Sequence, residues 1–291
     1  MILAHVHPGP AMAPGLLELV TVAAVLLVAV LYLLAAANLW RRGDVWPRWR
    51  GASFAAGGAG VAWAVVGSLP GGPFTAHMIQ HLIIGMAAPL LLVLGRPFTL
   101  ALRVLSPGAT RRRLLVLAHS HVVGWLIFPP PAALLNVGGL WLLYRTELFS
   151  VMRHNPWLHA VVHAHVLAAG LLYTFAVSQL DPVRRRRSPV LRGATLLTAG
   201  AAHAVLAKTL YAAEPPGTAF TAADLHTGAQ VMYYGGDLVE AALAAVVAAS
   251  WYRTTGRAWM RERHPAAMGR GAPAATGYRP PAEPRLSARR P

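Results

Sequence analysis

Residues 16–40 read LLELVTVAAVLLVAVLYLLAAANLW, an apolar run whose one charged residue is Glu18. About 20 apolar residues cross the hydrocarbon core of a bilayer as a helix. Every backbone group of such a segment must be hydrogen-bonded within it, so this run predicts a transmembrane helix. We expect a span rather than a cleavable signal peptide, because no basic residue precedes the run and it exceeds the roughly 7–15 residues of a signal core.

Six further apolar runs of similar length follow. They cover about residues 51–69, 74–94, 129–148, 156–177, 191–212 and 227–251. The predicted fold is therefore all-α, a polytopic membrane bundle of seven transmembrane helices over residues 1–263. Residues 264–291, rich in Pro, Ala, Gly and Arg, predict a disordered basic tail.

The segment between the third and fourth runs, residues 106–128, mixes arginines with an apolar face. This pattern favours an interfacial helix that ends before the three prolines at 129–131. The alternative is that its apolar end, residues 116–128, already begins the fourth span.

The composition of the whole chain supports a membrane protein. Of its 291 residues, 56% are hydrophobic and only 12% are charged, and the mean hydropathy is +0.47. Soluble domains carry roughly 25% charged residues. These values exclude a soluble enzyme and a disordered regulator, and the absence of cysteine excludes a disulfide scaffold and thiolate metal sites.

The basic residues that give the chain its net charge of +16 lie mostly in the connections between the runs and after the last run. Lys and Arg gather after the first, third, fifth and seventh runs, and only Arg145, Arg153 and Lys208 fall on the other side. Cytoplasmic loops are the basic ones. The sequence therefore predicts an outer N-terminus, a cytoplasmic C-terminus and a multi-pass protein of the cell membrane, with the bilayer and not nucleic acid as the partner of its arginines.

The histidines have the opposite distribution, because ten of the 13 fall on the outer side or in the outer to middle membrane. His77 and His81 are four residues apart and share one helix face, as do His159 and His163. His165 points to another face. Two such pairs from neighbouring helices predict a four-imidazole metal site.

Imidazole binds copper, zinc, iron and nickel, and a thioether favours Cu(I). Met78 beside the first pair, and His203 within the sixth run, are therefore further candidate ligands. Among intramembrane carboxylates, Asp237 and Glu240 share a helix face, and we expect Asp237 to be the functional one.

Two blocks of sequence resemble a known family, the CtaG membrane assembly factors of caa-type cytochrome c oxidase. The first is HMIQHLII at 77–84 with Pro89, Gly95 and Pro97, similar to the family's H-M-x-Q-H-hydrophobic-P-x-G-x-P. The second is LYRTELF at 143–149 followed by LHAVVHAH at 158–165, similar to L-Y-x-T-x-L-F and L-H-x-x-x-H-x-H. His203 fits a family histidine, whereas Tyr144 stands where members with W-x-W-H-x-P over residues 141–146 carry histidine.

The resemblance implies a non-enzymatic role in assembling haem-copper oxidase, with copper inserted or protected on the outer side of subunit I. The predicted metal ligands are His77, His81, His159 and His163, with His165, Met78 and His203 as possible partners. Two alternatives stay open. The same histidine pairs suit the axial ligands of haem in a b-type cytochrome, and a copper permease would need polar residues that continue to the inner side.

Overall fold

The computed structural model describes residues 15–182 and 186–268, and within these ranges the chain is helical without strands. The helices, of which η1 and η2 are π-helical turns, are α1 (Leu16–Arg41), α2 (Arg48–Val66), α3 (Pro73–Leu82), η1 (Ile83–Ala87), α4 (Ala88–Leu94), α5 (Pro97–Val104), α6 (Ala109–Ala118), α7 (His121–Leu126), α8 (Pro129–Ala133), η2 (Leu134–Gly138), α9 (Gly139–Arg145), α10 (Leu148–His154), α11 (Pro156–Ser178), α12 (Pro189–Ala212) and α13 (Ala222–Met268).

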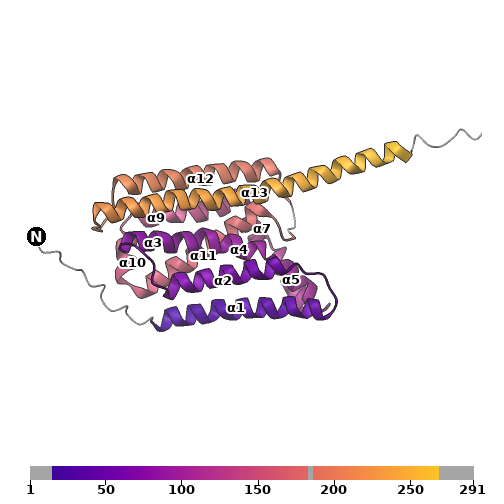
Figure 1. Cartoon of the computed structure of the whole chain (residues 1–291), viewed down its shortest axis with the longest axis horizontal. Coiled ribbons are helices and arrows are strands. Elements are labelled where there is room, and N and C mark those ends of the chain that lie inside the picture. The colour runs from indigo at the N-terminus through magenta and orange to yellow at the C-terminus, as the bar shows by residue number, and fades with distance from the viewer. Residues whose placement is uncertain (1–14, 183–185, 269–291) are drawn as a thin grey trace, which may run out of the picture. The chain divides into compact units, whose positions relative to one another are not determined.

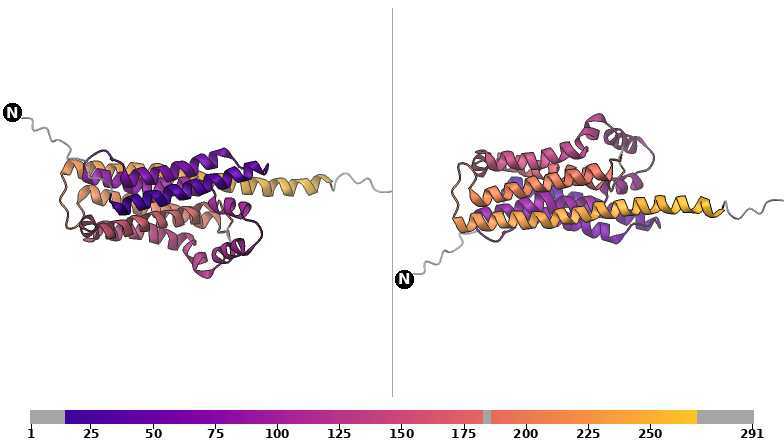
Figure 2. Two further views of the ribbon diagram at one scale, coloured as in Figure 1. Left: turned by 90° about the horizontal axis from the view of Figure 1, so that it is seen from below. Right: turned by 90° about the horizontal axis from the view of Figure 1, so that it is seen from above.

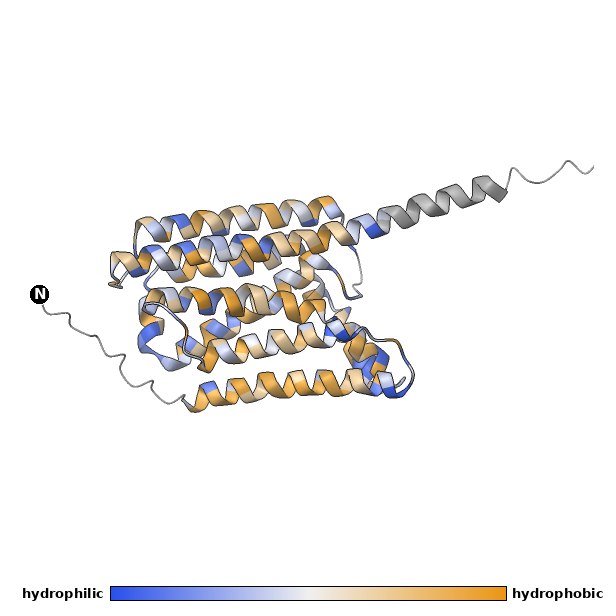
Figure 3. Ribbon diagram, in the orientation of Figure 1, coloured by the Kyte–Doolittle hydropathy of each residue, from blue (hydrophilic) through white to orange (hydrophobic). Residues whose placement is uncertain are grey.

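The long helices up to residue 250 lie side by side and alternate in direction (Figures 1 and 2). We call the end where α1, α3, α11 and α13 begin the histidine end, and the opposite end, where α2 and α12 begin, the arginine end. Hydrophilic segments gather at these two ends, and the helices between them are largely apolar (Figure 3). Residues 251–268 continue α13 in a second unit, which is described here only by its helical bounds.

Five helical segments are long and apolar enough to cross a membrane, which makes the chain a multi-pass membrane protein. They are Leu16–Arg41, Pro73–Val104, Pro156–Ser178, Pro189–Ala212 and Ala222–Arg253. The two other predicted spans form shorter or less apolar helices. One is α2, with 19 residues rich in Ala and Gly, and the other is the run from α8 to α9 over residues 129–145.

Prolines and short polar caps set where the spans begin. Pro73, Pro156 and Pro189 each occupy the first helical position, where a missing N–H is harmless. The Asn155 side chain accepts hydrogen bonds from the first two free backbone N–H groups of α11, and Ser188 caps α12. These signals explain why the predicted starts at 74, 156 and 191 lie within two residues of the observed ones.

The third and fourth predicted spans each contain a π-helical turn, η1 and η2, which the sequence did not reveal. Pro89 lacks the N–H that would bond the carbonyl of Gly85, so this carbonyl is free of its usual helical partner. It packs against Gly170 of α11, where an added Cβ would collide with it. Such π-helical turns re-aim side chains within a helix and are frequent at functional sites.

The connection over residues 106–128 is two short helices, α6 and α7, rather than the predicted single interfacial helix. The break follows from Ser120, whose hydroxyl accepts a hydrogen bond from the Val123 N–H and so starts α7 anew. The predicted tail from residue 264 begins inside α13, which continues to Met268, and residues 269–291 lie outside the described part.

Two buried clusters fill the part of the bundle built by α3 to α13. One surrounds Phe74, Leu140 and Met232 toward the histidine end, and the other surrounds Leu90, Val137 and Leu243. A third cluster, around Tyr32 and Phe54, joins α1 to α2 and α5. The first two clusters meet at a small cavity.

Candidate metal centre

The start of α3 is fixed by a carboxylate from α13. The carboxylate of Asp224 accepts hydrogen bonds from the backbone N–H groups of Phe74 and Thr75, at 2.9 and 3.0 Å, and from the Thr75 hydroxyl at 2.6 Å. These are free N–H groups of a helix N-terminus, which favours a negative charge. The contact sets the position of α3 relative to α13, and with it the positions of His77 and His81.

Three histidines from α3 and α11 gather near the histidine end, and we call them the outer cluster: His77, His159 and His163. The ring centroids of His77 and His163 are 6.0 Å apart with the rings nearly perpendicular. Those of His159 and His163 are 4.1 Å apart. The predicted meeting of the two helices through their histidine faces is therefore present for these three residues.

The hydrogen bonds of the outer cluster decide which ring nitrogens are available. His163 Nδ1 lies 2.8 Å from the carbonyl oxygen of His159, and because a carbonyl only accepts, Nδ1 carries the proton and Nε2 keeps its lone pair. His77 Nε2 lies 3.0 Å from the hydroxyl of Tyr144 on α9. A metal ion would therefore find a free nitrogen on His163 and would compete with Tyr144 for His77.

His81 pairs with His203 of α12, deeper in the bundle, and not with the outer cluster. Their ring centroids are 6.0 Å apart at an angle of 32°. Both side chains are buried, with 4% and 2% of their surface exposed. On its other side, His203 Nδ1 lies 3.8 Å from a carboxylate oxygen of Glu240. We call His81 and His203 the inner pair.

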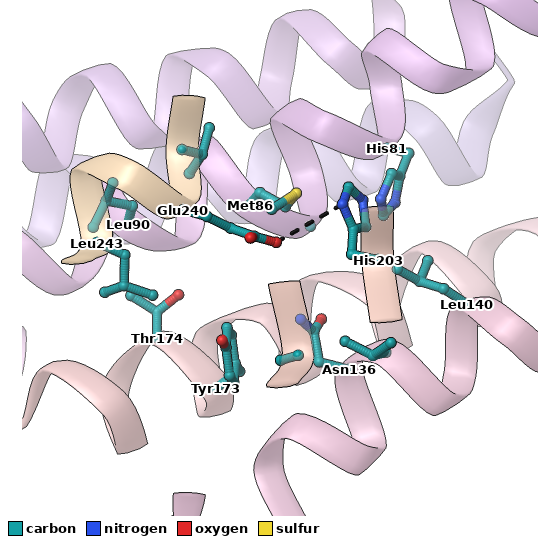
Figure 4. Close-up of a pocket in the computed structure, with 14 residues that line it drawn as sticks. His81, Met86, Leu90, Asn136, Leu140, Tyr173, Thr174, His203, Glu240 and Leu243 are labelled. Atoms are coloured by element: carbon teal, nitrogen blue, oxygen red, sulfur yellow. Dashed lines mark ion pairs between the residues drawn. The ribbon is translucent and has the colours of Figure 1, made fainter. Parts of the chain in front are cut away.

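The inner pair lines a small cavity between the helices (Figure 4). Its volume is about 20 Å³, enough for one water molecule or one ion. Met86 of η1 and Asn136 of η2 face it, so both π-helical turns contribute a polar or soft side chain. The remaining lining includes Glu240 and Tyr173 among aliphatic residues.

The single four-imidazole site expected from the sequence is thus divided between two levels of the bundle. His77 and His163 meet at one level, and His81 turns to His203 at the other. Among the residues that the structure describes, no three His, Asp or Glu side chains converge closely enough to hold a metal ion as they stand. The histidines form neighbouring pairs rather than one closed site.

The two remaining candidate ligands face other surroundings. Met78 is fully buried in the apolar cluster with Phe74, Leu140 and Met232. The His165 ring lies against α9, where its Nε2 is 2.7 Å from the position that a Cβ on Gly139 would take. His165 thus points to a different face of α11 from His163, as the spacing indicated.

The structure also reveals residues that sequence reasoning did not select. Tyr144 lies between the two levels, with ring centroids 6.0 Å from His77 and 6.4 Å from His81. Glu240 is the carboxylate beside His203, whereas Asp237, which we expected to be the functional carboxylate, is exposed in an open groove between α12 and α13. For Tyr144 the sequence did offer a signal, which is its position in the motif over residues 141–146.

Comparison with known proteins identifies relatives without an established activity. An uncharacterized protein of Mycobacterium tuberculosis is 35% identical over 173 residues, which is 56% of this chain and 26% of the relative. One of Mycobacterium leprae is 28% identical over 257 residues, 81% of this chain and 39% of the relative. The chain spans between about a quarter and two fifths of the length of these relatives. No solved structure matches it. The model of one protein family, cytochrome c oxidase caa3 assembly factor, matches residues 30–254.

Proposed function

The chain belongs to the family of cytochrome c oxidase caa3 assembly factors, and from this membership we propose that it binds copper at its outer cluster and passes it to the oxidase. The observation that carries the proposal is the outer cluster itself. Its three imidazoles come from α3 and α11, and neighbouring ring centroids are at most 6.0 Å apart. Imidazole is a good copper ligand, and the chain contains no thiol that could take this role.

The incomplete geometry of the outer cluster suits a carrier better than a permanent site. Closed four-ligand sites hold a structural metal, whereas sites with an open position exchange ligands. His77 and His163 offer a pair of nitrogens, and a ligand from a partner can complete the coordination. The process is ligand exchange, so the protein needs no catalytic group and is not an enzyme in this proposal.

The partner in this proposal is a subunit of the oxidase, with subunit I as the recipient of the copper. The orientation follows from the two ends of the bundle. The arginine end carries Arg48, Arg103 and Arg192, and basic residues mark the cytoplasmic side. The histidine end then faces the exterior of the cell membrane. In this proposal α2 and the run from α8 to α9 also cross the membrane, as the second and fourth of seven spans.

The test of the proposed function replaces His77 and His163 together with alanine in cells that depend on this protein. We expect oxidase activity, and the copper content of the purified oxidase, to fall to the level of a deletion strain. The matched control is His226→Ala, an imidazole of α13 that stacks on Tyr211, 4.2 Å away, outside the outer cluster. Wild-type copper content in the double variant would refute the proposal.

The orientation has an independent test. A reporter fused after Pro291 should be active on the cytoplasmic side, and a reporter fused before Met1 on the outer side. A reporter that is exoplasmic at the C-terminus would place the outer cluster on the cytoplasmic side and overturn delivery from the exterior.

A further inference from the structure

The inner pair has two imidazole nitrogens without a partner. His81 Nε2 and His203 Nε2 are both buried, and neither has a hydrogen-bond partner among the described residues. Buried polar atoms in folded proteins are almost always paired, so an unpaired one calls for a specific explanation. Both rings line one small cavity, so a single ligand within it could satisfy both nitrogens.

The distance between the two rings fits an ion held between them. Metal–nitrogen bonds of about 2 Å, together with the two ring radii, place the ring centroids of a bis-imidazole complex roughly 6 Å apart. The centroids of His81 and His203 are 6.0 Å apart. The cavity of about 20 Å³ is large enough for a single ion.

The other donors at the cavity select the kind of ion. The thioether of Met86 extends beside the Glu240 carboxylate and the His203 ring (Figure 4). A thioether is a poor partner for water but a good ligand for Cu(I). Glu240 supplies one negative charge, which balances a monovalent ion in a medium where an uncompensated charge is strongly unfavourable.

We propose that His81, His203, Met86 and Glu240 form a second, inner site for Cu(I), which is filled from the outer cluster. This inference rests on the proposed copper-binding function. His81 and His203 are the direct nitrogen ligands, Met86 is the sulfur ligand, and Glu240 balances the charge. The ion keeps its oxidation state throughout, because each transfer exchanges one neutral ligand for another.

The proposed route between the two sites follows the histidine rings. Successive centroids are 4.1 Å apart from His159 to His163, 6.0 Å from there to His77, and 6.0 Å between His81 and His203. His77 and His81 are one helical turn apart, a rise of about 6 Å, and Tyr144 lies beside both. In the proposed route, the ion passes from His77 to His81 along α3 and past Tyr144.

One residue of the inner site also borders a separate groove on the bundle. Glu240 lines the cavity of the inner pair and, in addition, the groove between α12 and α13 that contains Asp237. Its carboxylate lies against Gly200, where a side chain would leave no room for it. The ion can leave the inner site past Glu240 toward this groove, without returning to the histidine end.

The test titrates the purified full chain in detergent with Cu(I) alone, under anaerobic conditions and against a competing chelator. We expect about two Cu(I) per wild-type chain, about one for His203→Ala and about one for the pair His77→Ala and His163→Ala. His226→Ala is the matched control and should bind about two.

Met86→Leu keeps the volume of the side chain, so this variant should fold like the wild type. X-ray absorption of the loaded wild-type protein should show sulfur at about 2.3 Å from copper. This signal should disappear in Met86→Leu and persist in the outer double variant.

The two proposals fail in different ways. An unchanged copper count in His203→Ala, or a wild-type absorption spectrum in Met86→Leu, would refute the inner site and leave a water molecule as the occupant of its cavity. Two copper ions in the outer double variant would refute the outer cluster, and with it the proposed function. A wild-type protein that binds no Cu(I) would refute both.

Discussion

The Nε2 atom of His77 and the hydroxyl of Tyr144 lie 3.0 Å apart, so a tyrosine engages one of the ring nitrogens of the outer cluster. The hydroxyl donates to this nitrogen when His77 carries its proton on Nδ1. In the proposed copper site, a metal ion that binds through this nitrogen would have to break the hydrogen bond, which would lower the affinity and keep the copper exchangeable.

Replacement of Tyr144 by phenylalanine should increase the affinity of the outer cluster for Cu(I). A hydrogen bond contributes about 0.5–1.5 kcal/mol net, which corresponds to roughly a 2- to 12-fold tighter dissociation constant once the competition is removed. A chelator competition assay measures the change, and Tyr211→Phe, away from the outer cluster, is the control. Weaker binding by Tyr144→Phe would contradict the competition.

Replacement of Tyr144 by histidine should strengthen copper binding further. The resemblance to the family places a histidine at this position in some members, and here the ring would lie between His77 and His81. A further imidazole adds a ligand to the nitrogen pair of His77 and His163, and we expect at least about tenfold tighter binding and slower release. Stopped-flow transfer of Cu(I) to a chelator checks the release rate; release as fast as in the wild type would speak against a ligand at this position.

Asp224→Asn should lower the stability of the bundle. The carboxylate accepts hydrogen bonds from Phe74 and Thr75, and asparagine keeps only one acceptor oxygen and no charge for this helix start. We expect a loss of about 1–3 kcal/mol, seen as a lower melting temperature in detergent. Asp237→Asn, in the open groove, is the control and should melt like the wild type. Equal melting of the two variants would show that the cap does not hold α3.

Gly170→Ala should disturb the contact between α11 and η1. The added Cβ would collide with the carbonyl oxygen of Gly85, which belongs to a π-helical turn. Overpacking of this kind destabilises by about 1–3 kcal/mol. Gly193→Ala is the matched control, because nothing lies within 4 Å of its new Cβ and alanine favours the helix. Thermal unfolding of both variants gives the comparison, and a neutral Gly170→Ala would mean that η1 can move away.

The buried carboxyl of Asp181 should make the stability of the fold depend on pH. It follows α11, and its Oδ1 atom accepts hydrogen bonds from the N–H and the hydroxyl of Thr99, while burial raises the pKa of its carboxyl above the ordinary value. A raised pKa in the folded state means that this group stabilises the fold below its ordinary pKa and that the contribution is lost as pH rises through the folded pKa.

Asp181→Asn should remove that dependence. The wild type should gain melting temperature as the pH falls from neutral toward the ordinary pKa of Asp, and the variant should gain less. A thermal melt series in detergent measures the difference. If the melting temperatures of the two proteins change equally with pH, Asp181 does not titrate in this range.

Much of the fold could be predicted from residues that act locally. Pro73, Pro156 and Pro189 mark helix starts because they lack an N–H, and the arginine-rich connections separate the apolar runs. The shared face of His159 and His163 also followed from spacing, because residues four apart on a helix lie on one face. Each of these signals depends on only a few neighbouring residues.

The division of the site into two levels could not be predicted in the same way. Whether Asp237 or Glu240 meets His203 depends on the axial register of α12 against α13, which no local pattern encodes. The π-helical turns changed which residues face the cavity, so Met86 and Asn136 were not selected. Pro89 was a visible signal that the third span is irregular, but it did not indicate that Met86 would face the cavity.

The turn η1 has a consequence for how this sequence tolerates insertions and deletions. A π-helical turn holds one residue more than the α-helix it interrupts. Deletion of one residue within Ile83–Ala87 would remove this extra residue, so the span would continue as an α-helix with Leu90 and Val93 still facing the bundle interior. The same deletion within α4 would instead turn every later residue of the span by about 100°. The turn η1 is therefore where this span can lose a residue while its apolar half stays aligned with His77 and His81.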